Sequence, residues 1–214
     1  MNEDDLTARA RIRNAALRQF ADKGVKGTTI RGVAEAAGVS PALVQHHFGS
    51  KEQLREACDA YVMEYIRGAA TEAVDERGLD DPRFLASTYA TAPPVMTYLG
   101  RALVEGSPAA AAMFDEMVDM TEQYLKTYGQ LPPGDLRAQA VVFTAMKLGI
   151  TVLHGHVARA LGDEAFGPAT TARVGQASLD VVSPALVGPE MADLARAGID
   201  RYQQENGTKE QDDE

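Results

Sequence analysis

Residues 28–54 read TTIRGVAEAAGVSPALVQHHFGSKEQL, and this stretch decides the fold. The pattern predicts a short helix that one of the two leading threonines caps and that ends at Gly38. A second helix is expected to follow at once, with Ser40 as its N-cap and Pro41 at its first position, where the missing N–H costs nothing. Two helices joined by a tight turn, with a glycine that accepts a positive φ, have the layout of a helix-turn-helix.

Helices are also expected on both sides of this stretch. Upstream, a helix is predicted from about Thr7 to Lys23, ended by Gly24. Downstream, Ser50–Gln53 has the form of a capping box and opens a fourth helix that extends towards Arg77. The upstream helix carries one apolar stripe, formed by Ala8, Ile12, Ala15, Ala16 and Phe20.

The rest of the chain is expected to be helical as well, because helical periodicity dominates and β-branched clusters bounded by turns are missing. Turn-forming clusters divide it at residues 80–82, 93–94, 106–108, 131–134, 162–168 and 188–189. The longest and most apolar helical segment is 135–161. The polar, acidic tail, 207–214, is expected to be disordered. The fold class predicted is therefore all-α.

Composition narrows the class of protein. The chain has 214 residues, of which 45% are hydrophobic and 24% charged, so fibrous and wholly disordered classes are excluded. Its single cysteine, Cys58, cannot form an internal disulfide, which favours a reducing compartment. The acidic N-terminus does not resemble a signal peptide, and no apolar window approaches a membrane span. A cytoplasmic location is expected.

The charge is distributed unevenly along the chain. The formal net charge is −10, yet residues 6–55 contain nine Lys and Arg against three Asp and Glu. The acidic excess lies in residues 1–5 and 56–214. This asymmetry indicates a basic interaction module on an acidic body.

The motif in residues 8–60 resembles the tetracycline-repressor (TetR) family of bacterial transcription regulators. The residues that carry the resemblance are Phe20, Gly24, Thr28-Thr29-Ile30, Val33-Ala34, Ala37-Gly38-Val39-Ser40, His47-Phe48 and Ser50-Lys51-Glu52-Gln53-Leu54. The chain departs from the family at Gln45, where Tyr is usual, and at Pro41-Ala42, where Lys-Gly is frequent. Operator preference therefore does not transfer from the family to this chain.

The resemblance implies an N-terminal three-helix DNA-binding head, residues 6–55, and a C-terminal helical bundle for effector binding and dimerisation, residues 56–206. At about 100° per residue, one face of the helix after Ser40 is expected to enter the major groove. With Arg31 of the preceding helix, the base-reading residues are Arg31, Pro41, Ala42, Gln45 and His46. By resemblance, the phosphate contacts are Thr28, Thr29, Ser40, His47 and Lys51.

Several of these side chains could have another role than base contact. Gln45 and His46 could face solvent, and His47 could pack on the first helix. Arg31 could hold a phosphate instead of reading guanine. The surrounding motif favours base contact by Gln45, which can pair with adenine N6 and N7.

The body is expected to bind a mostly hydrophobic effector and to dimerise. Soft and aromatic side chains suit an irregular apolar ligand, although core packing explains any one of them as well. The candidate pocket residues are Tyr61, Tyr65, Met96, Met113, Phe114, Met117, Tyr124, Phe143 and Met146. Small residues at helical spacing suggest a close helix–helix interface between two copies or, alternatively, a buried helix of a monomer. The candidate interface residues are Ala145, Gly149, Val152, His156, Val174, Ala177, Val181 and Ala185.

Metal, cofactor and catalytic sites are not expected. His154 and His156 are two residues apart and would point in different directions on a helix, so they cannot bind one ion. The function predicted is a homodimeric repressor that leaves its palindromic operator when a small effector binds. An activator or ligand-independent regulator of the same fold is the alternative, and an all-α enzyme or small-molecule-binding protein is a more distant one.

Overall fold

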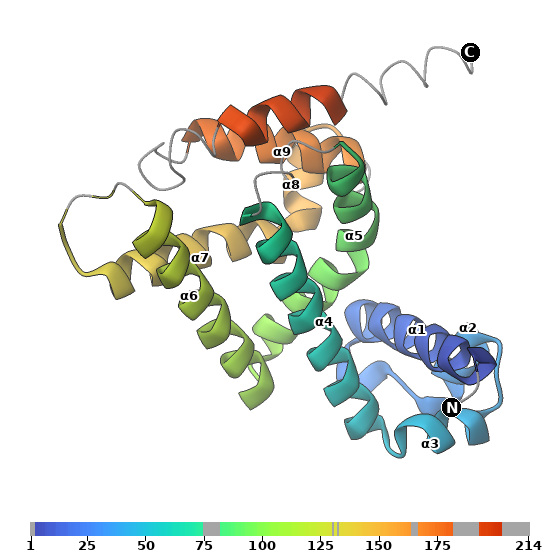
Figure 1. The fold of residues 1–214 in the computed structure, drawn as a ribbon. Helices are drawn as coiled ribbons and strands as arrows, with labels where there is room; N and C mark the ends of the chain where they lie inside the picture. The colour runs from blue at the N-terminus through green and yellow to red at the C-terminus, as the bar shows by residue number, and fades with distance from the viewer. Residues whose placement is uncertain are drawn as a thin grey trace, which may run out of the picture. The chain divides into compact units, whose positions relative to one another are not determined.

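The computed structural model describes residues 3–74, 82–129, 131, 133–163, 167–181 and 193–202. In these ranges every regular element is a helix, so the prediction of an all-α chain is confirmed (Figure 1). The helices are α1 Glu3–Gly27, α2 Ile30–Ala37, α3 Pro41–Phe48, α4 Lys51–Val74, α5 Pro82–Glu105, α6 Pro108–Tyr128, α7 Leu136–Val152, α8 His154–Ala160 and α9 Pro168–Val181. A further helical segment spans 193–202.

Two helix boundaries differ from the sequence prediction. The expected turn at 93–94 is wrong, because α5 continues through both prolines. The apolar segment 135–161 is not one helix: it breaks at Leu153 into α7 and α8, whose axes differ by 70°. The turn predicted at 106–108 is confirmed, and at 131–134 the described residues 131, 133 and 134 are not helical. Residues 132 and 188–189 and the tail 207–214 lie outside the residues that the structure describes.

The chain forms two compact units that do not follow the predicted boundary at residue 55. Unit 1 comprises residues 1–67 and 94–111, and unit 2 comprises 68–93 and 112–214. The first part of α4 and the last part of α5 therefore belong to the same unit as α1–α3.

The core of unit 1 is built on the predicted apolar stripe of α1. Ala8, Ile12, Ala15, Ala16 and Phe20 are all buried. Further buried side chains of this core come from α2, α3, α4 and α5, among them Val33, Ala34, Val44, Phe48, Leu54, Cys58, Val62, Val95 and Leu99. Near its end α1 turns at Gly24, whose φ of 69° and ψ of 177° are not helical, which confirms the break predicted there.

Local caps fix the ends of α2 and α3. The Thr29 hydroxyl accepts a hydrogen bond from Gly32 N at 3.1 Å, and Ser40 Oγ accepts one from Leu43 N at 3.2 Å. Between the helices Gly38 adopts φ 65°, the left-handed conformation predicted for the turn. The capping box is confirmed too, because the Ser50 and Gln53 side chains each accept the other residue's backbone N–H.

Loss of the Ser40 cap is expected to destabilise unit 1. In Ser40→Ala the N–H of Leu43 loses its side-chain acceptor, so the free energy of unfolding should fall by about 1 kcal/mol. Chemical denaturation measures the change. Ser40→Asp keeps an acceptor at the cap and should restore most of the stability, and equal losses in both variants would contradict this role of the cap.

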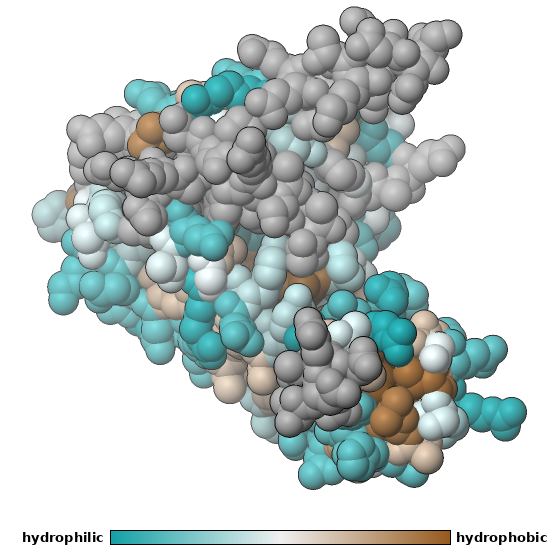
Figure 2. Space-filling view, turned by 45° about the vertical axis from the view of Figure 1, so that its right-hand side comes forward, coloured by the Kyte–Doolittle hydropathy of each residue, from teal (hydrophilic) through white to brown (hydrophobic). Residues whose placement is uncertain are grey.

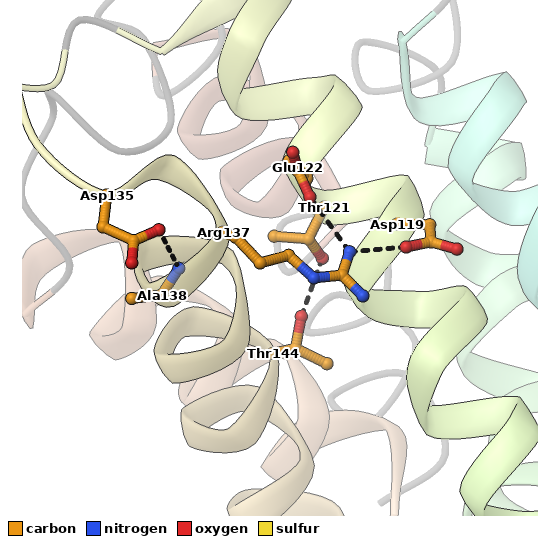
Figure 3. Close-up of polar contacts among 7 residues, drawn as sticks. All are labelled: Asp119, Thr121, Glu122, Asp135, Arg137, Ala138 and Thr144. Carbon is orange, nitrogen blue, oxygen red and sulfur yellow. Dashed lines mark hydrogen bonds and ion pairs between the residues drawn. The ribbon is translucent and has the colours of Figure 1, made fainter.

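In unit 2, polar contacts join α6 and α7 (Figure 3). A small apolar cluster lies between the same helices. Arg137 at the start of α7 pairs with Asp119 and Glu122 of α6, the second at 2.9 Å. Two turns further along α7, the Thr144 hydroxyl donates to the Thr121 hydroxyl of α6 at 2.9 Å. The buried apolar residues between these helices are Val118, Leu125 and Ala140.

No single helix in the part of the chain that the structure describes has the length and apolarity of a membrane span. Only α7 and α8 taken together reach these limits, as a pair bent by 70°.

Candidate nucleic-acid interface

The residues predicted to read bases lie on the exposed face of the helix-turn-helix. On α3, Pro41, Ala42, Gln45 and His46 are all exposed, and Arg31 on α2 is exposed as well. The opposite face of α3 is in the core, where Val44 is 0% and Phe48 is 7% exposed. Burial of one face therefore leaves the other free to contact a ligand.

The surface around these helices is chemically mixed. Figure 2 shows a brown apolar patch in the region of α1–α3, with teal polar side chains around it. Amide groups such as that of Gln45 can pair with base edges, and apolar groups such as the Ala42 methyl can touch the methyl of thymine. The head thus offers both kinds of group that direct readout in a major groove uses.

Two of the predicted phosphate contacts, Thr29 and Ser40, are exposed hydroxyls at the N-termini of α2 and α3. Each hydroxyl oxygen accepts a capping hydrogen bond, which leaves its O–H free to donate to another acceptor. A helix N-terminus also favours an anion. Both residues therefore have the position and the donor that a phosphate contact requires.

Thr28, another predicted phosphate contact, is not exposed as Thr29 and Ser40 are. Its side chain is 1% exposed, and its hydroxyl donates to Gly24 O at 2.8 Å. That bond uses the only hydroxyl hydrogen and ties the residue to the break in α1. His47 is half-buried, with its ring 5.5 Å from that of His46 and 6.3 Å from that of Phe48.

Lys51 has a structural bond that sequence reasoning did not predict. Its ammonium group donates to Val25 O at 3.0 Å and to Thr28 O at 3.3 Å, so it joins the start of α4 to the last turn of α1 and to the residue that follows α1. One ammonium hydrogen is left for a further acceptor such as a phosphate oxygen.

Removal of the Lys51 ammonium group is expected to destabilise the protein in the absence of DNA. In Lys51→Met two carbonyl groups lose a charged donor, and the free energy of unfolding should fall by about 1–3 kcal/mol. Lys23→Met at an exposed position is the matched control and should change it by less than about 0.5 kcal/mol. Equal effects of the two substitutions in urea denaturation would mean that these bonds contribute no stability.

Sequence reasoning also missed the side chains that join the head helices. Gln19 Nε2 on α1 donates to Gly32 O on α2 at 2.7 Å. The guanidinium of Arg13 lies 3.5 Å from the centre of the Tyr61 ring, and that of Arg9 lies 5.0 Å from the centre of the Phe48 ring. No local pattern marks such contacts, because the partners are many residues apart in the sequence.

A buried polar pair in unit 1 was missed as well. Asp59 on α4 accepts a hydrogen bond from the Tyr98 hydroxyl on α5, and both residues are buried. A signal was present in the sequence, because Asp59 lies beside the apolar residues Cys58 and Val62.

The candidate effector residues are divided between the two units. Tyr61, Tyr65 and Met96 belong to unit 1, and the other six belong to unit 2. Met113 and Met117 are buried, while Phe114 and Tyr124 pack against the apolar cluster of α6 and α7. Met146 is 53% exposed and lies in an open hollow of about 310 Å³ on α7, which Ala138, Gln139, Val142, Phe143 and Met146 line.

The candidate interface residues lie on partly or fully exposed faces of α7, α8 and α9. Gly149, Val152 and Val174 are half-buried, and the exposed members are Ala145, His156, Ala177 and Val181. Val181 is 79% exposed. Ala185 lies outside the described residues.

Two family descriptions match the chain in order. "Bacterial regulatory proteins, tetR family" matches residues 12–58, and "Tetracyclin repressor-like, C-terminal domain" matches residues 90–187. The first match contains the whole helix-turn-helix, and the second falls in the remainder of the chain.

Among curated relatives, the HTH-type transcriptional regulatory protein RaaS of Mycobacterium tuberculosis is 46% identical over 130 residues, which are 58% of this chain and 58% of RaaS. The HTH-type transcriptional regulator BetI of Rhizobium meliloti is 44% identical over 61 residues, 28% of this chain and 30% of BetI. The chain thus aligns with less than two thirds of the length of either relative.

Solved structures share the fold. The TetR family protein CprB from Streptomyces coelicolor, in complex with its operator sequence, has a TM-score of 0.62 at 19% identity and covers 94% of this chain and 98% of its own. A gamma-butyrolactone receptor (ArpA-like protein) has a TM-score of 0.60 at 17% identity, with coverages of 95% and 100%. At these identities the likeness shows the fold alone.

Proposed function

This chain belongs to the TetR family of bacterial regulatory proteins, and we propose that it regulates transcription by binding operator DNA through α2 and α3. The observation that carries the proposal is the capped helix-turn-helix whose outer face presents Arg31, Gln45 and His46 while its inner face is buried. The basic balance of residues 6–55 in an acidic chain supplies the attraction to phosphate. Such a protein acts where the bacterial DNA lies, in the cytoplasm.

The proposed form on DNA is a homodimer that reads two half-sites. Helix-turn-helix dimers place their recognition helices about 34 Å apart, so a second copy is needed to reach the next major groove on the same side. Support comes from apolar side chains that a single chain leaves exposed on unit 2: Val142 57%, Met146 53%, Leu153 51% and Val181 79%. Burial against a second copy would remove them from water.

The proposed mode of regulation is repression that a small apolar effector relieves. Support comes from the methionine and aromatic side chains of unit 2, which can adapt to an irregular ligand. The effector must bind the released state more tightly than the DNA-bound state, because equal affinity would shift nothing. A compound that binds the protein and leaves operator affinity unchanged is thereby excluded as the effector.

In-vitro selection from random duplex DNA at about 0.15 M salt tests the proposed function, since non-specific binding is weak under those conditions. Enrichment of an inverted repeat is expected, and sedimentation of the bound protein should show two copies per duplex. A folded protein that enriches no sequence would contradict the proposal. An enriched site without dyad symmetry, bound by one copy, would keep DNA reading and reject the homodimer.

A further inference from the structure

A buried polar pair joins α4 to α5 inside unit 1. Asp59 is 8% exposed and Tyr98 is 3% exposed. The Tyr98 hydroxyl donates to Asp59 Oδ1 at 2.5 Å, and the other carboxylate oxygen lies 3.6 Å from Nε of Arg55, one turn earlier on α4. Cys58, Val62 and Leu99, the apolar neighbours of the pair along the two helices, are all buried.

Such a pair is a costly way to join two helices. Burial raises the pKa of the Asp59 carboxyl group and the pKa of the Tyr98 phenol, because each charged form loses hydration. Apolar side chains would hold the helices together without this cost, but they tolerate small changes of register. A buried hydrogen bond keeps its strength over a narrow range of distances and angles, so a shift of α5 along α4 would weaken it and leave the carboxylate unsatisfied.

The same face of α5 also contacts the end of α1. The Tyr98 ring meets the Phe20 ring edge-on, with centroids 6.2 Å apart. One and two turns later, Arg101 and Glu105 pair with each other at 3.1 Å and lie over Gly24. A Cβ atom at Gly24 would approach Glu105 Oε1 to 2.5 Å. The hollow left at this junction holds about 10 Å³, the space of a single water.

One of the two helices joined in this way, α4, directly follows α3, the helix proposed to enter the major groove. α4 begins at Lys51, three residues after α3 ends at Phe48, so the position of α4 restricts where the C-terminal end of α3 lies. Both α4 and α5 run on from unit 1 into unit 2, at residues 67–68 and 93–94. Gly68 and the two prolines at these points are poor residues for a helix interior, which favours bending there over bending at the Asp59–Tyr98 contact.

We propose that Asp59 and Tyr98 are positioning residues: their hydrogen bond holds α5 against α4 and α1 in the register that presents α3 to a half-site. The inference rests on the proposed function and assigns to the pair the control of half-site spacing, in addition to any contribution to stability. Residues 94–111 thereby act as part of the DNA-binding head.

The test compares Tyr98→Phe with wild type on two duplexes at 10 °C, after circular dichroism has been used to check that both proteins are folded. One duplex is the selected inverted repeat, and the other has one base pair added between its half-sites. The wild type should discriminate strongly between them. In Tyr98→Phe the ratio of the affinities for the two duplexes should fall about tenfold, while the affinity for a scrambled duplex stays unchanged.

Two further variants separate positioning from stability. Tyr128→Phe at the end of α6 is the matched control, because this tyrosine is 39% exposed and lies in unit 2, and it should behave as wild type. Asp59→Asn keeps an acceptor for Tyr98 and should retain spacing discrimination, whereas Asp59→Leu should lose it, even if Tyr98→Phe does not fold.

The outcomes are distinct. A lower melting temperature of Tyr98→Phe or Asp59→Leu with unchanged spacing discrimination would show a purely structural role and overturn the inference. A wild type that prefers no duplex would instead overturn the proposed function, and the inference with it.

Discussion

Replacement of Phe20 by alanine is expected to lower the free energy of unfolding by about 3–5 kcal/mol, the largest stability effect that we predict. The side chain is 1% exposed and lies on the stripe of α1 around which the helices of unit 1 pack. Its ring also meets Tyr98 edge-on, so the substitution removes an aromatic contact as well as apolar volume.

Urea denaturation followed by circular dichroism measures this loss. Val104→Ala, at a position 69% exposed in the same unit, is the control and should change stability by less than about 0.5 kcal/mol. DNA binding of Phe20→Ala should fall with the folded fraction of the head. A loss under about 1 kcal/mol would show that unit 1 does not depend on the α1 core.

Gln45→Ala is expected to relax base discrimination at one position of each half-site by about 1–3 kcal/mol, or roughly tenfold or more. Gln45 is exposed on α3 beside Ala42 and His46 and carries both a donor and an acceptor, which matches the N6 and N7 groups of adenine. Because phosphate contacts remain, affinity for unrelated DNA should hardly change.

Binding to the full set of single-base variants of the selected operator measures this effect. Gln123→Ala, at an exposed glutamine on α6, is the matched control and should leave the profile as in the wild type. Superimposable profiles for Gln45→Ala and wild type would remove Gln45 from the base-reading residues.

The parts of the fold that follow from local chemistry could be predicted from the sequence. Ser40 and Gly38 were assigned correctly because caps and positive-φ turns depend on neighbouring residues. The apolar stripe of α1 was predicted from its spacing alone, and each member is buried. The exposure of Gln45 follows from the same periodicity, since Val44 on the other side of α3 is in the core.

The errors arose where packing overrides local preference. Pro93-Pro94 are strong turn formers, yet α5 runs through them, so the rest of the helix sustains it despite the missing N–H donors. In contrast, 135–161 has no strong helix breaker at Leu153, and the chain bends there by 70°. Thr28 could serve DNA or the fold by its residue type, and the structure shows its hydroxyl bonded to Gly24 O.

Contacts between residues that are far apart in the chain could not be predicted from the sequence. Asp59 and Tyr98 are 39 positions apart, and Lys51 reaches a carbonyl 26 residues earlier. Periodicity shows which face of a helix is apolar but not which helix it meets. For the same reason the effector and interface residues stay predictions, since an apolar residue on a helix suits a core, a pocket or a second copy equally.

The most direct test of the central claim is the ratio of two dissociation constants at about 0.15 M salt, for the selected inverted repeat and for a scrambled duplex of the same composition. If α2 and α3 read sequence as proposed, the selected duplex should bind at least about 1,000-fold more tightly. Equal affinities, with the protein folded, would contradict the claim that this face of the head reads DNA.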